Sequence, residues 1–167
     1  MNRLITLSLL LVLMIPQTLT AATQPQPQVT YPCSVLLKPV KDIPNAQGTA
    51  LVVRLKKPYT ESPTSPVRER QGVGIYADWL PSPSSFGDYD QYEGFAQIPG
   101  EISWRFKMYQ GEEDAPSWFG GTPWTGKFDE ISSELPVNTQ VEVRLSNSKT
   151  GKLGPAILQN TLHGCRH

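Results

Sequence analysis

The sequence has little of what enzymes commonly use for nucleophilic or acid–base catalysis. Its two histidines, His163 and His167, both lie close to the carboxyl end, and no Gly-x-Ser-x-Gly motif presents a serine nucleophile. A hydrolytic triad needs a base beside its nucleophile, so we do not expect a histidine-dependent enzyme. The two histidines alternate with Cys165, but a sulfur held in a disulfide is not available as a metal ligand.

An excess of basic residues is also missing. The chain has 15 Lys and Arg residues against 15 Asp and Glu residues, a formal net charge of 0 at pH 7. Nucleic-acid-binding domains usually carry a basic patch that neutralises phosphates, so we expect no nucleic-acid partner. The chain has no Asn-x-Ser/Thr sequon either, which fits a bacterial exported protein.

No apolar run is long enough for a membrane span. The longest, Leu4 to Ile15, falls short of the roughly 18 residues that cross a bilayer. It follows Arg3 and precedes small residues ending in Ala22, the pattern of a secretory signal peptide over residues 1–22. We therefore expect a secreted or periplasmic protein. Residues 23–32 are rich in Pro and Gln and predict a flexible tether before a domain over 33–167.

Cysteine is scarce, and its placement is informative. Cys33 and Cys165 lie just inside the two ends of the expected domain. In an exported protein two such cysteines are usually paired, so the sequence predicts one disulfide that clamps the first and last strands together.

Helical periodicity is absent, and short segments of alternating apolar and polar residues take its place. Such alternation, broken by Pro- and Gly-rich connections, predicts strands. The segments are 33–37, 51–56, 73–79, 92–98, 101–109, 126–131, 141–145 and 155–162. Seven or eight short strands predict a single-domain all-β sandwich of immunoglobulin-like architecture, with a flattened barrel as the runner-up. We take 101–109 as a central strand and expect a monomer.

The stretch 100–128 holds three of the four tryptophans and supplies the candidate binding site. Aromatic rings offer large flat surfaces on which sugars or a protein partner pack. Glycines among them let a ligand approach the backbone. The site consists of Tyr109, Asp114, Trp118, Phe119 and Trp124. The sequence thus predicts a non-catalytic module that binds a glycan or an exported protein, although the same loop could instead fold inward and plug the core.

Acidic residues leave two other interpretations open. Asp88, Asp90 and Glu93 could gather oxygens around calcium, but their spacing is not that of an EF-hand, and we expect neither a metal nor another cofactor. Carboxylates of the same loops could form the acid pair of a secreted glycosidase-like hydrolase. A secreted toxin or enzyme inhibitor that inserts a rigid loop is a third class, which fold alone does not rank.

Overall fold

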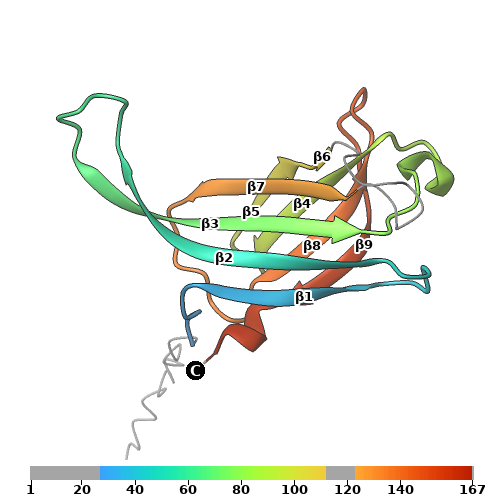
Figure 1. Cartoon of the computed structure of the whole chain (residues 1–167), viewed down its shortest axis with the longest axis horizontal. Helices are drawn as coiled ribbons and strands as arrows, with labels where there is room; N and C mark the ends of the chain where they lie inside the picture. The colour runs from blue at the N-terminus through green and yellow to red at the C-terminus, as the bar shows by residue number, and fades with distance from the viewer. Residues whose placement is uncertain (1–26, 112–122, 167) are drawn as a thin grey trace, which may run out of the picture.

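A computed structural model describes residues 27–111 and 123–166 (Figure 1). Regular structure in these residues is β-strand, apart from two short 3-10 segments, η1 (Pro83–Phe86) and η3 (Leu162–Cys165). The strands are β1 (Cys33–Pro39), β2 (Gln47–Pro58), β3 (Val67–Asp78), β4 (Gln91–Ile98), β5 (Ile102–Lys107), β6 (Tyr109–Gln110), β7 (Trp124–Ile131), β8 (Gln140–Ser146) and β9 (Leu153–Thr161). The expected all-β fold is confirmed.

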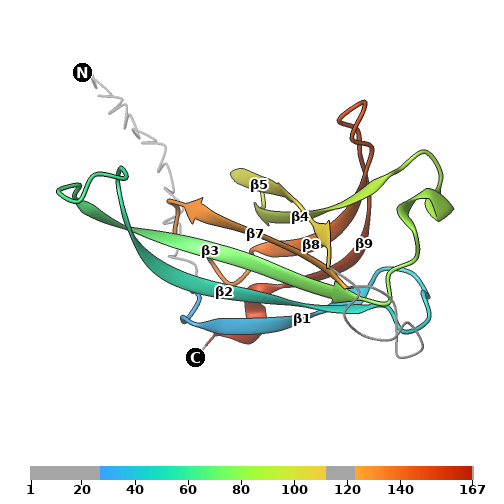
Figure 2. The same ribbon diagram turned by 45° about the horizontal axis from the view of Figure 1, so that its top comes forward.

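The nine strands of the described residues form one antiparallel sheet in the order β5-β4-β8-β9-β1-β2-β3-β7-β6. The sheet folds into two layers, with β1, β2, β3 and β7 in front of β4, β5, β8 and β9 (Figures 1 and 2). The hairpin of β2 and β3 is the longest and extends beyond the body as an arm.

Two bent segments join the layers. In β1, residues 33–37 pair with β2, while Lys38 and Pro39 pair with β9. On the opposite side β5 pairs with β4, and after Met108 the chain continues as β6, which pairs with β7. The ends of the strand order therefore meet, and the sheet is nearly closed into a barrel. The flattened barrel, the runner-up from the sequence, fits this arrangement.

The core lies between the two layers, because side chains alternate between the two faces of each strand. Fully buried side chains include Val52, Val73, Tyr92, Val141, Val143, Leu145 and Leu158. The hydroxyl of Tyr92 donates a hydrogen bond to the carbonyl of Pro81, and burial raises the pKa of this tyrosine. The core thus satisfies its largest polar side chain internally.

The expected disulfide is confirmed. Cys33 begins β1, and Cys165 lies in η3 after β9, with their Cα atoms 5.6 Å apart and their sulfurs bonded. Just before it, Val29 is buried, and its N–H donates to the carbonyl of Leu135. The described part of the expected tether, 27–32, therefore packs against the domain.

The position predicted for the strand 101–109 is wrong. The stretch 101–109 is not a central strand. It divides into β5 and the start of β6, which lie at the two ends of the strand order. The alternation of apolar and polar residues in 101–109 does not distinguish the two cases, because a strand at the corner of a barrel also has one buried face. At Gly72 the pairing of β3 with β7 is irregular, because its register shifts between Gln71 and Val73.

Candidate functional site

The outer faces of the two layers carry different chemistry. On β4, β5, β8 and β9 the outward side chains are mainly charged or polar, with Phe95 as an exception, and we call this surface the polar face. On β1, β2 and β3 they include exposed leucines and a tyrosine, and we call this surface the apolar face. In Figure 1 the apolar face is turned toward the viewer.

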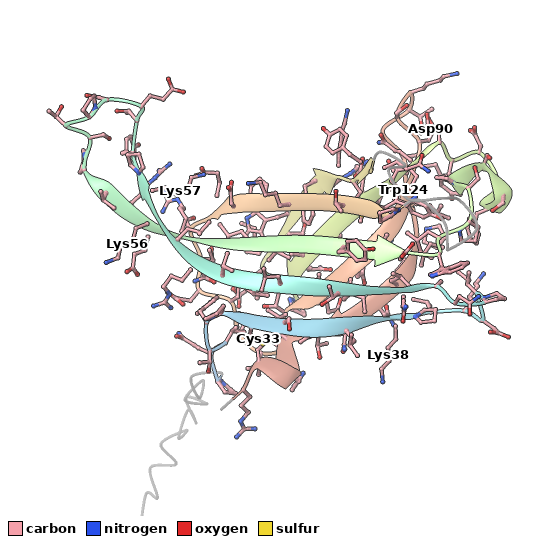
Figure 3. The ribbon with its side chains drawn as sticks, in the orientation of Figure 1. Cys33, Lys38, Lys56, Lys57, Asp90 and Trp124 are labelled. Atoms are coloured by element: carbon pink, nitrogen blue, oxygen red, sulfur yellow. A yellow bond between two sulfur atoms is a disulfide. The ribbon has the colours of Figure 1, made fainter. Side chains whose placement is uncertain are left out.

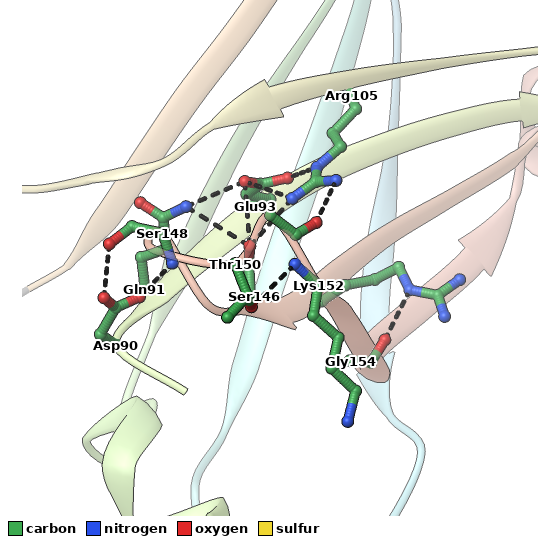
Figure 4. Close-up of polar contacts among 11 residues, drawn as sticks. Asp90, Gln91, Glu93, Arg105, Ser146, Ser148, Thr150, Lys152 and Gly154 are labelled. Carbon is green, nitrogen blue, oxygen red and sulfur yellow. Dashed lines mark hydrogen bonds and ion pairs between the residues drawn. The ribbon is translucent and has the colours of Figure 1, made fainter. Parts of the chain in front are cut away.

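A network around Glu93 organises one end of the polar face (Figure 4). Although Glu93 points outward from β4, it is only 4% exposed. Both of its carboxylate oxygens accept from the guanidinium of Arg105 on β5, and one accepts from the hydroxyl of Ser146. Arg105 also donates to the carbonyl of Gly151. The network therefore ties the β8–β9 connection onto the sheet.

Asp90 also holds the β8–β9 connection, through hydrogen bonds to Ser148. Its two oxygens accept from the backbone N–H and the hydroxyl of Ser148, at 2.7 and 2.5 Å. These hydrogen bonds favour the charged form and hold the pKa of Asp90 below its usual value. Asp88 contributes its backbone carbonyl to Asn147.

Two of the three candidate calcium ligands, Asp90 and Glu93, thus have their carboxylates engaged by protein donors. Over residues 27–111 and 123–166, no three His, Cys, Asp or Glu side chains are grouped so as to hold a metal ion. Across the same ranges, no helix is long and apolar enough to cross a membrane.

A pocket of about 310 Å³ opens on the polar face where β8, β9 and the end of β1 meet. Its lining is polar apart from one proline. The lining residues are Lys38, Pro39, Gln140, Glu142, Gln159, Asn160 and Thr161. The register explains the grouping, because Glu142 lies opposite Gln159, and Gln159 lies opposite Lys38.

Glu142 is the most deeply placed charge of this pocket. The residue is 8% exposed, and its Oε2 accepts from Arg144 at 3.1 Å. Among the described residues, Arg144 is the one side chain that donates a hydrogen bond to this carboxylate. The other oxygen, Oε1, is therefore available to a ligand. Arg144 is itself held by the carbonyl of Gly154 and lies over the ring of Phe95. The carboxylate is therefore held in place before any ligand arrives.

The structure does not bring the described members of the expected aromatic site together. Tyr109 is 67% exposed and pairs with Thr125, on the outer side of the barrel. Trp124 pairs with Ala77, which is fully buried, and its ring meets Tyr92 edge-on at 5.1 Å between centroids. Asp114, Trp118 and Phe119 lie outside the described residues. Trp124 is also far from Lys38 of the pocket (Figure 3).

Replacing Trp124 by Ala should lower the free energy of unfolding by about 2–3 kcal/mol, because a half-buried ring and its contact with Tyr92 are lost. Replacing Tyr109 by Ala should change it by less than about 0.5 kcal/mol, because that ring is exposed. Urea denaturation of both variants measures the difference. Equal effects would mean that Trp124 does not support the core.

The pocket residues were missed from sequence because nothing marks them locally. Alternation in 141–145 assigns Glu142 and Arg144 to the outward face of a strand, where charged residues are ordinary. Their neighbours come from strands that are distant in the chain, and only the pairing of β8, β9 and β1 collects them. The one local indication of a polar site was the run of three hydrogen-bonding side chains in 159–161, two amides and a hydroxyl.

Comparison with known proteins identifies a family and a relative of this chain. A family model described as "SPbeta prophage-derived uncharacterized protein YoqH" matches residues 29–166. The chain is similar to the protein of that description from Bacillus subtilis (strain 168), with 49% identity over 136 residues, 80% of this chain and 82% of that protein. No solved structure matches. The matched range contains both cysteines and the whole pocket lining.

Proposed function

Because the chain belongs to the family described as SPbeta prophage-derived uncharacterized protein YoqH, a description that names no ligand, we propose a function from the geometry of the pocket itself. The protein is an exported, non-catalytic module that binds a glycan through the pocket on its polar face. The observation that carries this proposal is a pre-formed cavity of about 310 Å³ lined almost entirely by hydrogen-bonding side chains.

Export rests on two features. The first 22 residues have the charge, apolar run and small-residue ending of a signal peptide. The Cys33–Cys165 disulfide is of a kind that persists in oxidising compartments. An exported protein meets cell-wall and extracellular glycans, which are abundant polar ligands there.

The pocket lining suits hydroxyl-rich ligands. A sugar ring presents neighbouring hydroxyl groups that both donate and accept, and a carboxylate or a side-chain amide can engage two of them at once. Glu142 supplies Oε1 as an acceptor oxygen, and Gln140 and Gln159 supply amides that donate and accept. Lys38 adds a donor at the rim. The volume lies at the lower end of the range of about 300–1,000 Å³ for ligand pockets, which favours one or two sugar units.

The arginine pairs favour binding over hydrolysis. A glycosidase needs two carboxyl groups that face each other across the scissile bond, one of them as a proton donor. On the polar face Glu93 is saturated by Arg105 and Ser146, and Glu142 is held by Arg144. The carboxylates therefore act as fixed acceptors.

The proposal is tested with a glycan array probed by the disulfide-bonded protein, followed by calorimetric titration of the best ligand. The variant Glu142→Gln keeps the shape of the side chain but removes the charge and one acceptor, and Gln159→Ala removes an amide. Glu142→Gln should weaken binding at least tenfold, because hydrogen bonds to a charged group contribute about 1.5–3 kcal/mol. Gln159→Ala should weaken it by about three- to tenfold, because a neutral hydrogen bond contributes about 0.5–1.5 kcal/mol. The melting temperature of Gln159→Ala should stay within about 2 °C, because this side chain lies outside the core. Glu142→Gln should lower it by roughly 3–6 °C, because Arg144 loses its charged partner, so binding is compared at a temperature where both variants are folded.

Glu101→Gln is the matched control, because this glutamate is exposed in the β4–β5 turn, outside the pocket lining. It should bind as the unaltered protein does. Binding that survives Glu142→Gln and Gln159→Ala but is lost in Trp118→Ala would assign the ligand to the aromatic stretch instead. Absence of binding to every glycan on the array would contradict the proposal.

A further inference from the structure

The polar face carries more cations than anions once the end of β1 is included. The charged residues are Glu93, Arg105, Lys107, Glu142 and Arg144 on β4, β5 and β8, and Lys38 on β1. Glu93 is paired with Arg105, and Glu142 is paired with Arg144, whereas among the described residues no ion pair involves Lys38 or Lys107. The whole chain has a formal net charge of 0, so this excess is local and favours an anionic ligand on the polar face.

Lys38 is the unpaired cation that reaches the glycan pocket. It is exposed and lies near the end of β1, where that strand pairs with β9 (Figure 3). The register places Glu142 opposite Gln159, and Gln159 opposite Lys38. Because neighbouring strands are about 4.8 Å apart, the backbones of Glu142 and Lys38 are separated by about 10 Å. The pocket therefore has an acceptor oxygen at one end, an ammonium group at the other and an amide between them.

We propose that the glycan bound in this pocket is acidic, an inference that rests on the glycan-binding function proposed above. The carboxylate of a uronic acid accepts hydrogen bonds from the ammonium of Lys38 and the amide of Gln159, and a hydroxyl group of the same sugar donates to Oε1 of Glu142. A hydrogen bond between two charged groups is stronger than one between neutral groups. The reverse orientation would place the sugar carboxylate against Glu142, where like charges repel, so the two ends of the pocket also fix the direction of the sugar.

Arg144 disfavours the opposite class of charged sugar, the amino sugars. An ammonium group that approached Oε1 of Glu142 would lie beside the guanidinium that donates to Oε2 at 3.1 Å. Since Glu142 and Arg144 neutralise each other, Lys38 leaves the pocket with an excess of one positive charge. A cationic ligand is therefore repelled, whereas one carboxylate neutralises the site.

The inference is tested by calorimetric titration of the disulfide-bonded protein at neutral pH, where a sugar carboxyl is ionised. The ligands are disaccharides of glucuronic, galacturonic and mannuronic acid, each beside its methyl ester, which lacks the charge and keeps the ring hydroxyls. At least one acid should bind about tenfold more tightly than its ester, the size of one hydrogen bond to a charged group. Raising the salt concentration from about 0.02 to 0.5 M should weaken binding of the acid and leave that of the ester within about twofold, because salt screens exposed charges.

Lys38→Met removes the ammonium and keeps most of the aliphatic length. It should reduce the preference for the acid to less than about twofold and leave binding of the ester within about twofold, with a melting temperature within about 2 °C. Glu142→Gln should instead weaken the ester at least as much as the acid, because the hydroxyl that reaches Oε1 is common to both ligands. Lys107→Met is the matched control, because this exposed lysine of the polar face lies outside the pocket lining, and it should change neither affinity.

Three results would overturn the inference and leave glycan binding in place. They are equal affinities for each acid and its ester, equal losses for both ligands in Lys38→Met, and tighter binding of a glucosamine disaccharide than of every acid. Absence of binding to any glycan would contradict the proposed function itself, and this inference with it.

Discussion

Removing the Cys33–Cys165 disulfide should lower the free energy of unfolding by about 4–5 kcal/mol, and the melting temperature by roughly 15 °C. The two cysteines are 132 residues apart, so the bond closes a loop that includes almost the whole domain. Without it the unfolded chain gains the conformational freedom that the closed loop denies it. Calorimetry and urea denaturation of Cys33→Ala/Cys165→Ala, beside the oxidised protein, measure this loss.

The reduced protein is the matched control, because it keeps both side chains and loses only the bond. It should melt close to the double alanine variant. A loss under about 1 kcal/mol would show that the ends are fixed by other contacts, such as the hydrogen bond from the N–H of Thr30 to the carbonyl of Cys165. A fold that tolerates reduction so well would also remove one of the two supports for export.

The strands could be predicted because their information is local. In β8 the inward Val141, Val143 and Leu145 are fully buried, and the outward Glu142 and Arg144 meet solvent or the pocket, as alternation requires. The disulfide could be predicted because two cysteines allow a single pairing. These features depend on side-chain period and composition, which a single sequence displays.

The closure of the sheet could not be predicted in the same way. It depends on two bends, within β1 and at Met108, where one strand changes partners between layers. Alternation continues through such a bend, so a strand at a corner and a central strand look alike. The pocket shares this difficulty, because Lys38, Glu142 and Gln159 meet only through pairings between distant segments.

Glu93 shows how an outward position can still be buried. Its place in β4 assigns it to the outer face, opposite Lys107 on β5 and Arg144 on β8. Arg105, two residues before Lys107 on β5, reaches its carboxylate. The connection from β8 to β9 then folds over it, held by Ser146 and by the bond from Arg105 to Gly151. A carboxylate enclosed in this way needs its cation, since burying an unpaired charge is costly.

Replacing Arg105 by Met should therefore lower the free energy of unfolding by about 3 kcal/mol. Methionine keeps much of the aliphatic length, so the loss comes mainly from leaving the carboxylate of Glu93 buried without its guanidinium partner. Glu93→Gln alone should cost less, about 1–2 kcal/mol, because the arginine that remains is partly exposed and can reach water. Urea denaturation of each variant measures the two losses.

The double variant Arg105→Met/Glu93→Gln distinguishes electrostatics from packing. With the charge gone, methionine no longer leaves an ion unpaired, so the double variant should be more stable than Arg105→Met alone by about 1–2 kcal/mol. Lys149→Met, an exposed cation on the same connection, should change stability by less than about 0.5 kcal/mol. Additive losses in the double variant would mean that Arg105 contributes through its contacts with Gly151 and Ser146 rather than through its charge. In that case hydrogen exchange should be faster in the β8–β9 connection of Arg105→Met than of Glu93→Gln, because only the former loses the bond that holds residue 151.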